Sequence, residues 1–192
     1  FVNDNLANAI VPFLTIDTPW TVIYDSSDET VFYPIAGQKQ NHLTALFVGN
    51  TSRPIKRFND IELICREADV ELLVARNVPR HQLVFLYNKA DVCINFSVAE
   101  GGPQTFAEAA LCEVPMLICS DNALTKHIPC FIGQTQQDFV DILTRLKYNR
   151  NKCIEKGQLA RRAVLQNFTY KHAAKKFADF FLLLWQQDNQ GS

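Results

Sequence analysis

The sequence predicts an α/β fold in which a parallel sheet is covered by helices on both faces, and three observations lead to this prediction. Short apolar runs alternate with segments of helical periodicity along residues 43–119. The runs are apolar throughout rather than alternating with polar residues, as expected of strands buried on both faces. With 192 residues, 47% hydrophobic and 20% charged, the chain can bury one sizeable core.

The expected elements follow one another in a regular order. Apolar runs predict strands at residues 43–48, 70–75, 92–96 and 115–119, with a weaker strand near 131–132. Apolar positions that recur every three or four residues predict helices at residues 58–68, 79–90, 103–112, 137–148 and 151–168. A last helix is expected from Thr169, a residue type that commonly caps helices. This succession of strand and helix favours a Rossmann-like domain.

The last predicted helix carries an unusually bulky apolar stripe. Its members are Phe177, Phe180, Phe181, Leu184 and Trp185. Two interpretations stay open: the stripe is a core face, or part of it packs on a domain outside this sequence. Because the only methionine is Met116, we expect the chain to be part of a longer protein.

Composition and spacing exclude several classes of function. The net charge of −1 gives no overall attraction to nucleic acid or to anionic membranes. No apolar run approaches the ~18 residues of a membrane span, and no secretory signal is recognisable. The six cysteines lack CxxC pairs and the four histidines lack metal-ligand spacing, which indicates reduced thiols in a cytoplasmic protein without a metal site. The motifs of α/β-hydrolases and P-loop NTPases are absent.

The segment with the most candidate ligand-binding residues is SVAEGGPQTFAEAALCEVP at residues 97–115, which follows a predicted strand. Ligands of parallel α/β sheets bind where the carboxyl ends of the strands meet the following loops, so we expect a site here. Gly101 and Gly102 let a ligand approach the backbone closely. The amide groups at the helix start near Pro103 suit a pyrophosphate, and they need no metal to bind it.

Two carboxylates flank this helix start. Glu100 precedes the helix and Glu108 lies inside it, so the two are staggered by about 8 to 10 Å along a bound ligand. Each carboxylate can accept hydrogen bonds from neighbouring sugar hydroxyls, and we expect Glu108 to face the cleft. Two glutamates at this spacing are also common on the surface of an ordinary helix. The adjoining strand end and glycines favour the ligand site.

A second candidate segment is the loop at residues 49–57, GNTSRPIKR, which brings three cations to the end of the first predicted strand. Beside the helix start at Gly101, these cations would neutralise a diphosphate. Arg53 can bind it in a bidentate manner and Lys56 as a point charge, which stabilises a leaving group. The alternative is a solvated basic loop.

Taken together, these residues resemble the donor domain of the group 1 retaining glycosyltransferases of the GT-B fold. Members of that family share an E-x7-E motif, which Glu100 and Glu108 match. The similarity extends over most of the chain: VIYDSSDETVFYP, LFVGN, YNKADVCINFS and QLARRAVLQNFTYKHAAKKFADFF are all similar to family segments. The chain departs from the family at Asn50, where the family usually has arginine, and residues 56–91 form a shorter stretch than usual.

The resemblance implies a role for each candidate residue. It implies that Glu100 contacts the transferred sugar as the catalytic carboxylate and that Glu108 contacts the ribose. It assigns the diphosphate to Arg53 and Lys56. The implied donor-binding set is completed by Gly49, Gly101, Gly102, Pro103 and Thr105.

The resemblance also implies a division into an interdomain linker at residues 1–34, a nucleotide-sugar-binding domain at 35–168, and a terminal helix at 169–192 that packs toward a missing N-terminal domain. The expected reaction is retaining transfer of a hexose from a nucleotide diphosphate sugar, without metal or other cofactor. The unknown sugar or glycan acceptor, and any peripheral membrane contact, belong to the missing domain, so this chain alone should be inactive. Two alternatives stay open: a non-catalytic binding or scaffold module, and a nucleotide-sugar epimerase or hydrolase.

Overall fold

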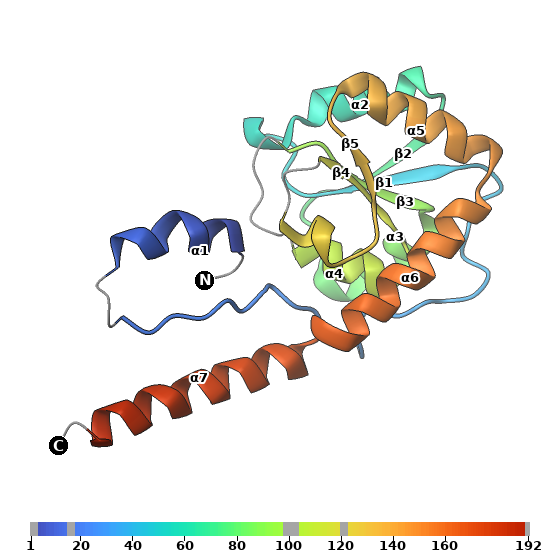
Figure 1. Ribbon diagram of the computed structural model, residues 1–192. Coiled ribbons are helices and arrows are strands. Elements are labelled where there is room, and N and C mark those ends of the chain that lie inside the picture. Colours follow the sequence, from blue (N-terminus) through green and yellow to red (C-terminus); the bar gives the residue numbers. More distant parts are fainter. Residues whose placement is uncertain (1–3, 15–17, 98–103, 120–122, 191–192) are drawn as a thin grey trace.

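The fold was obtained as a computed structural model, which describes residues 4–14, 18–97, 104–119 and 123–190 (Figure 1). Its five strands form one parallel sheet in the order β2-β1-β3-β4-β5. The strands are β1 (Thr44–Val48), β2 (Glu71–Ala75), β3 (Val92–Asn95), β4 (Met116–Cys119) and β5 (Phe131–Gly133). In the centre of the sheet, Leu46 of β1 lies between Leu73 of β2 and Cys93 of β3.

Helices follow the strands as the periodicity predicts. They are α1 (Asp4–Ile10), α2 (Phe58–Glu67), α3 (Arg80–Lys89), α4 (Gln104–Leu111), α5 (Gln136–Tyr148), α6 (Asn151–Asn167) and α7 (Tyr170–Gln190). The predicted helices differ from the observed ones by one or two residues at their ends. Helix α1 was not predicted, and neither were the short 3-10 helices Val11–Phe13, Pro54–Lys56 and Ala123–Lys126.

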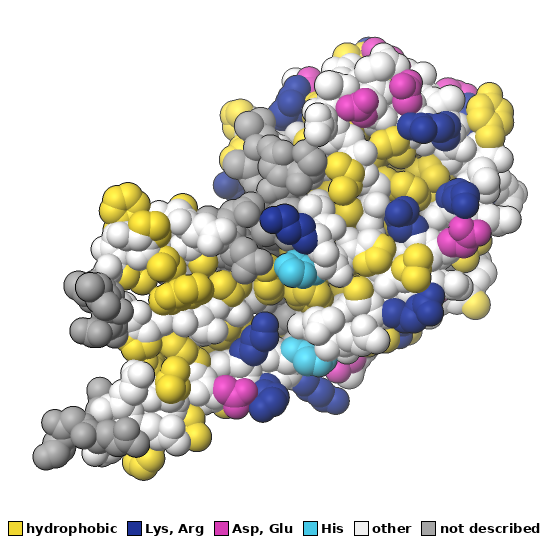
Figure 2. All heavy atoms as spheres, in the orientation of Figure 1, with side chains coloured by type: hydrophobic (Ala, Val, Ile, Leu, Met, Phe, Trp, Pro, Cys, Tyr) yellow, Lys and Arg dark blue, Asp and Glu magenta, His cyan; other side chains and the backbone are white. Residues whose placement is uncertain are grey.

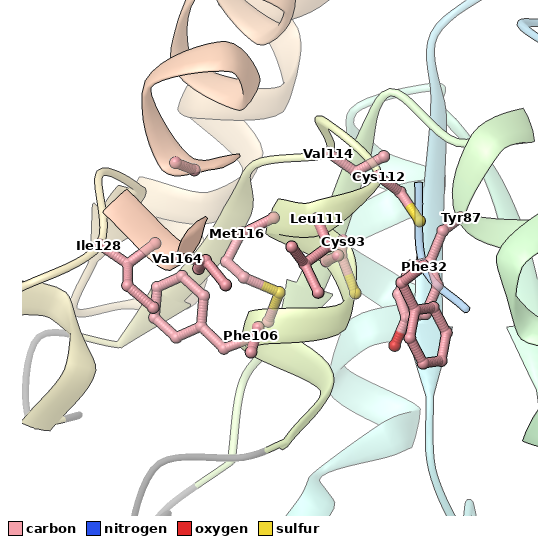
Figure 3. Close-up of a cluster of buried hydrophobic side chains, with 14 of the residues drawn as sticks. Phe32, Tyr87, Cys93, Phe106, Leu111, Cys112, Val114, Met116, Ile128 and Val164 are labelled. Atoms are coloured by element: carbon pink, nitrogen blue, oxygen red, sulfur yellow. The ribbon is translucent and has the colours of Figure 1, made fainter. Parts of the chain in front are cut away.

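The sheet separates two apolar clusters, and this confirms the predicted fold class. Because strand side chains alternate, Leu46 points into one cluster while Ala45 and Phe47 point into the other. Helices α2 and α5 cover the face of Phe47, and α3, α4 and α6 cover the face of Leu46 (Figure 1). Figure 3 shows part of the Leu46 cluster, in which Phe106 of α4 lies near Val164 of α6.

The cysteines lie where the sequence predicts them, as free thiols inside apolar segments. Five of the six are buried, and Cys119 is half-buried. Burial raises the pKa of Cys65, Cys112 and Cys153 to about 12. These thiols therefore stay protonated and serve as small core side chains.

Helix α6 packs very closely on the turn between α4 and β4. At Gly157 of α6, an added Cβ would lie 2.0 Å from the backbone oxygen of Glu113. Glu113 itself adopts a left-handed conformation, with φ of 59°. A residue without a side chain is therefore required at position 157, because any other would push α6 away from the turn.

The N-terminal segment is anchored to the body of the domain near α7. Phe32, near the end of the predicted linker, is fully buried in the Leu46 cluster. Ser27 forms a short parallel bridge with Thr169, immediately before α7. From this point α7 runs away from the sheet (Figure 1). The division of the chain at residues 34 and 168 remains a prediction.

The bulky stripe of α7 is largely exposed. Phe177, Phe181 and Trp185 have exposed fractions of 50%, 63% and 67%. Figure 2 shows apolar side chains along this helix and the N-terminal segment beside it. A groove between them is lined by Phe177 and Phe180 of α7 and by residues that include Trp20. The interpretation of the whole stripe as a core face is therefore wrong, because the described part of the chain does not cover it.

Candidate functional site

The two candidate loops leave the sheet from the same rim. Strands β1 and β3 are parallel neighbours, so the segments that follow them start side by side. The loops also touch: the guanidinium of Arg57 lies over the ring of Phe96, 4.2 Å from its centroid. Residues 98–103 lie outside the described part of the chain, so the expectation that the turn at 100–103 and the cationic loop at 53–56 share one rim stays a prediction.

Lys56 is the cation held closest to the end of β1. Gly49 has φ of 152°, and a Cβ there would lie 3.3 Å from the Phe47 ring and 3.9 Å from Cε of Lys56. The lysine stem therefore lies against the glycine, and the residue as a whole is half-buried. A residue with a side chain at position 49 would therefore crowd the Phe47 ring, in a backbone conformation that favours glycine.

The other two cations of the loop are Arg57 and Arg53. Arg57 adopts a left-handed conformation at the start of α2, where its Nε lies 2.6 Å from Oδ2 of Asp60. This ion pair with α2 and the stacking on Phe96, which follows β3, fix the orientation of the Arg57 side chain. Arg53 is exposed at the start of the short helix Pro54–Lys56. The stem of Lys56, by contrast, lies against Gly49 at the end of β1.

Glu108, which we expect to face the cleft, is buried. Its exposed fraction is 4%. The hydroxyl of Tyr87 donates to its Oε2 at 2.9 Å, and the guanidinium of Arg80 lies 3.1 Å from its Oε1. Burial raises the pKa of Glu108, and the Tyr87 hydrogen bond and Arg80 charge oppose this rise. Both partners come from the neighbouring helix α3.

The Tyr87 side chain is buried, like the Glu108 carboxylate that it contacts. Tyr87 is fully buried, and its ring meets that of Phe32 edge to face at 5.8 Å between centroids. Burial raises the pKa of Tyr87 well above its usual value, and the nearby charge of Glu108 adds to the rise. Tyr87 is therefore a permanent hydrogen-bond donor to Glu108.

Arg80 covers Glu108 on the outer side and remains 40% exposed. Its guanidinium also donates to Oγ of Ser27 at 3.2 Å. The side-chain oxygen of Gln104, in the amide orientation that satisfies its neighbours, accepts from both terminal nitrogens of Arg80 at 3.1 Å. Residues at the starts of α3 and α4 thus meet the N-terminal segment at one polar cluster.

Four predicted residues lie outside the described part of the chain: Glu100, Gly101, Gly102 and Pro103. Thr105 lies in the first turn of α4 and is half-buried. At the end of β3, the amide of Ser97 donates to Oδ1 of Asn95 at 2.9 Å. The buried hydroxyl of Ser97 finds no hydrogen-bond partner among the described residues.

Sequence reasoning did not identify Arg80, Tyr87, Gln104 or Ser27 as parts of the site. Arg80 and Tyr87 are seven residues apart, a spacing that places both on one face of the predicted helix. This spacing can be recognised in the sequence alone. Their common partner Glu108 belongs to another helix, and no local pattern connects the two.

Metal clusters and membrane-spanning helices are both absent from the described residues. No group of three or more His, Cys, Asp or Glu side chains in the described ranges could hold a metal ion. Within those same ranges, no helix has both the length and the apolar character needed to cross a membrane.

Comparison with known proteins identifies a family and a fold. The profile of a family described as glycosyl transferase-like matches residues 39–179. No curated protein sequence matches the chain significantly. Many solved structures do match.

Three of these structures illustrate the shared fold. Sucrose-phosphate synthase from Thermosynechococcus elongatus has a TM-score of 0.76 at 14% identity, over 97% of this chain and 58% of its own. A mutant of S. aureus TarM, in complex with fondaparinux, alpha-GlcNAc-glycerol and UDP, has a TM-score of 0.77 at 11% identity, over 94% and 43%. The C-terminal domain of LpcC, a group 1 family glycosyl transferase from Francisella tularensis, has a TM-score of 0.62 at 13% identity, over 75% and 99%. The chain thus spans 58% and 43% of the first two structures.

Proposed function

The chain belongs to the glycosyl transferase-like family, and from this premise we propose that it is the donor-binding domain of a retaining GT-B glycosyltransferase of group 1. The reaction is transfer of a hexose from a nucleotide diphosphate sugar to an acceptor held by a second domain. The observation that carries the proposal is the parallel pairing of β1 and β3, which makes the loop after β1 and the segment after β3 start on one rim of the sheet.

The diphosphate is the part of the donor for which the described residues offer most. The Lys56 stem lies against Gly49, the residue that directly follows β1. The first turn of α4, with Thr105, begins on the same rim, where helix amides favour an anion. Arg53 is exposed in the same loop and can reach toward a bound phosphate. No metal is required for this arrangement.

The roles of the two glutamates follow the E-x7-E pattern. We assign Glu100 to the transferred sugar and Glu108 to the ribose, with the backbone of Gly101, Gly102 and Pro103 at the sugar and phosphate. A carboxylate has about four acceptor positions, and Tyr87 and Arg80 occupy two of those on Glu108. Ribose hydroxyls can therefore still donate to Glu108, provided that the ligand reaches beneath the partly exposed Arg80 side chain.

The acceptor domain is proposed to contact α7. Phe181 and Trp185 are more than half exposed, and apolar side chains on one helix are normally buried against a partner. A cleft needs both walls to position donor and acceptor, so this chain by itself should transfer almost nothing.

A nucleotide panel tests the proposal. UDP, GDP and ADP, with their glucose conjugates, are added to the purified chain while its melting temperature is followed. At a concentration one hundred times its Kd, a ligand that binds only the folded state raises the free energy of unfolding by about 2.7 kcal/mol. This corresponds to a rise in melting temperature of about 5 to 10 °C for a domain of this size. The nucleotide of one base, with its glucose conjugate, should give this shift in melting temperature. A panel without any shift would refute the proposal.

A matched pair of variants locates the binding site. Lys56→Ala should weaken nucleotide diphosphate binding by about 10 to 100 fold, because a charge-assisted hydrogen bond contributes about 1.5 to 3 kcal/mol. Lys152→Ala removes an exposed lysine from α6 and should leave the affinity unchanged. Equal affinities for the two variants, measured by calorimetry, would remove Lys56 from the site.

One observation favours a second candidate function, a non-catalytic scaffold module. Glu108 is already satisfied by Tyr87 and Arg80, as a purely structural carboxylate would be. A scaffold would bind none of the nucleotides, and Glu108→Ala would then change only stability.

A further inference from the structure

The N-terminal segment and the start of α7 are joined by backbone hydrogen bonds. The amide of Ser27 donates to the carbonyl of Phe168 at 3.1 Å, and the amide of Tyr170 donates to the carbonyl of Ser27 at 3.1 Å. Ser27 is fully buried and Thr169 is nearly so. We call this crossing of residues 26–28 and 168–170 the junction. It is the place where the predicted linker and the predicted terminal helix meet.

Arg80 connects the junction to Glu108. Its guanidinium lies 3.2 Å from Oγ of Ser27 and 3.1 Å from Oε1 of Glu108. Aromatic rings flank it, with the centroid of Phe32 at 5.3 Å and that of Tyr170 at 5.8 Å. One side chain of α3 therefore contacts the N-terminal segment, the start of α7 and a carboxylate of α4.

The chemistry of this cluster suits an arginine better than a lysine. A guanidinium is planar and offers five donors in a fixed fork, so it can bind two oxygens while its faces lie against rings. A lysine keeps the charge, but it has no second nitrogen to donate to Gln104 and no flat face to lie against the rings of Phe32 and Tyr170. Because Glu108 is buried, the arginine charge also favours its ionised form.

We propose that Arg80 is a positioning residue that couples ligand occupancy at Glu108 to the closure of the junction. This proposal rests on the proposed function, since the ligand is the nucleotide part of the donor. When the junction is closed, Ser27 and Tyr170 hold Arg80 against Glu108, and the carboxylate is fixed to accept ribose hydroxyls. When the junction opens, Glu108 loses its counterion and its orientation. Coupling is reciprocal, so nucleotide binding closes the junction to the same degree.

Amide hydrogen exchange at Ser27 and Tyr170 measures the junction directly, since both amides are donors in it. Without ligand, Arg80→Ala should speed the exchange of these two amides by about tenfold or more relative to the amide of Leu46 in β1. Arg66→Ala, which removes an exposed arginine from α2, should leave their exchange unchanged. Unchanged exchange in Arg80→Ala would overturn the proposal.

The coupling itself is tested with Arg80→Lys, which keeps the charge. With the nucleoside diphosphate that binds best, such as UDP, the wild type should show slower exchange at Ser27 and Tyr170. In Arg80→Lys this protection should be lost and Kd should rise by about 5 to 150 fold, the usual range of coupling between sites. Equal Kd and equal protection in both proteins would overturn the proposal. If the wild type binds no nucleotide, the proposed function fails, and the ligand-free exchange still decides whether Arg80 holds the junction.

Discussion

Replacing Tyr87 by phenylalanine removes a single oxygen from the centre of the site. The ring is fully buried, so Phe fills the same space and leaves no large cavity. What is lost is the 2.9 Å hydrogen bond to Oε2 of Glu108. A hydrogen bond to a charged group contributes about 1.5 to 3 kcal/mol, which corresponds to a fall in melting temperature of about 3 to 12 °C for a domain of this size.

The loss of stability in Tyr87→Phe should depend on pH. Burial raises the pKa of Glu108 above its ordinary value of 4.5, so its contribution to stability is fully present below 4.5 and falls as pH rises through the folded-state pKa. The Tyr87 hydrogen bond favours the ionised form and opposes the rise. Tyr87→Phe therefore raises the pKa of Glu108 further, and the variant loses more stability near neutrality than in acid.

Urea unfolding at several pH values checks this expectation. The difference in the free energy of unfolding between wild type and Tyr87→Phe should be small below 4.5 and should grow toward neutral pH. Tyr148→Phe provides the control, because Tyr148 is 86% exposed and its hydroxyl is hydrated in both states. A difference that stays constant across the pH range would refute the assignment of Glu108 as the partner of Tyr87.

Two substitutions elsewhere test the packing that positions the site. In urea unfolding, Gly157→Ala should lower the free energy of unfolding by about 1 to 3 kcal/mol. Alanine favours helix, but its Cβ would meet the Glu113 oxygen. A variant as stable as wild type would contradict the close approach of α6. Asp91→Ala should cost about 3 to 5 kcal/mol, since this buried carboxylate accepts from the amide of Thr44 at 2.9 Å and lies 2.8 Å from Arg150. Its melting temperature should fall well below that of Glu155→Ala, and equal values would show that the Asp91 pairs contribute little.

The fold could be predicted because its signals are local. Continuous apolar runs such as residues 43–48 are typical of strands buried on both faces, and the intervening periodicity fixes the helices to within one or two residues. The N-terminal helix α1 escaped prediction because its seven residues are too few to show a helical period.

The site could be predicted only in part. The order of strands and loops is sufficient to place Lys56 and the start of α4 on one rim, because parallel strands end together. Which of the three loop cations lies near the strand could not be predicted, since contacts with Phe96 and Asp60 fix the orientation of Arg57. The burial of Glu108 depends on how α3 packs against α4, which is a tertiary relation without a sequence pattern.

The proposed function depends above all on one claim, that the loop after β1 and the first turns of α4 form a single binding site for a nucleotide diphosphate. Backbone NMR during a titration with UDP, GDP or ADP tests this claim most directly, residue by residue. We predict that the largest shifts fall on the amides of Gly49, Lys56 and Thr105. Shifts confined to the opposite rim, around His42 and Lys147, would contradict it, as would a spectrum that none of the three nucleotides changes.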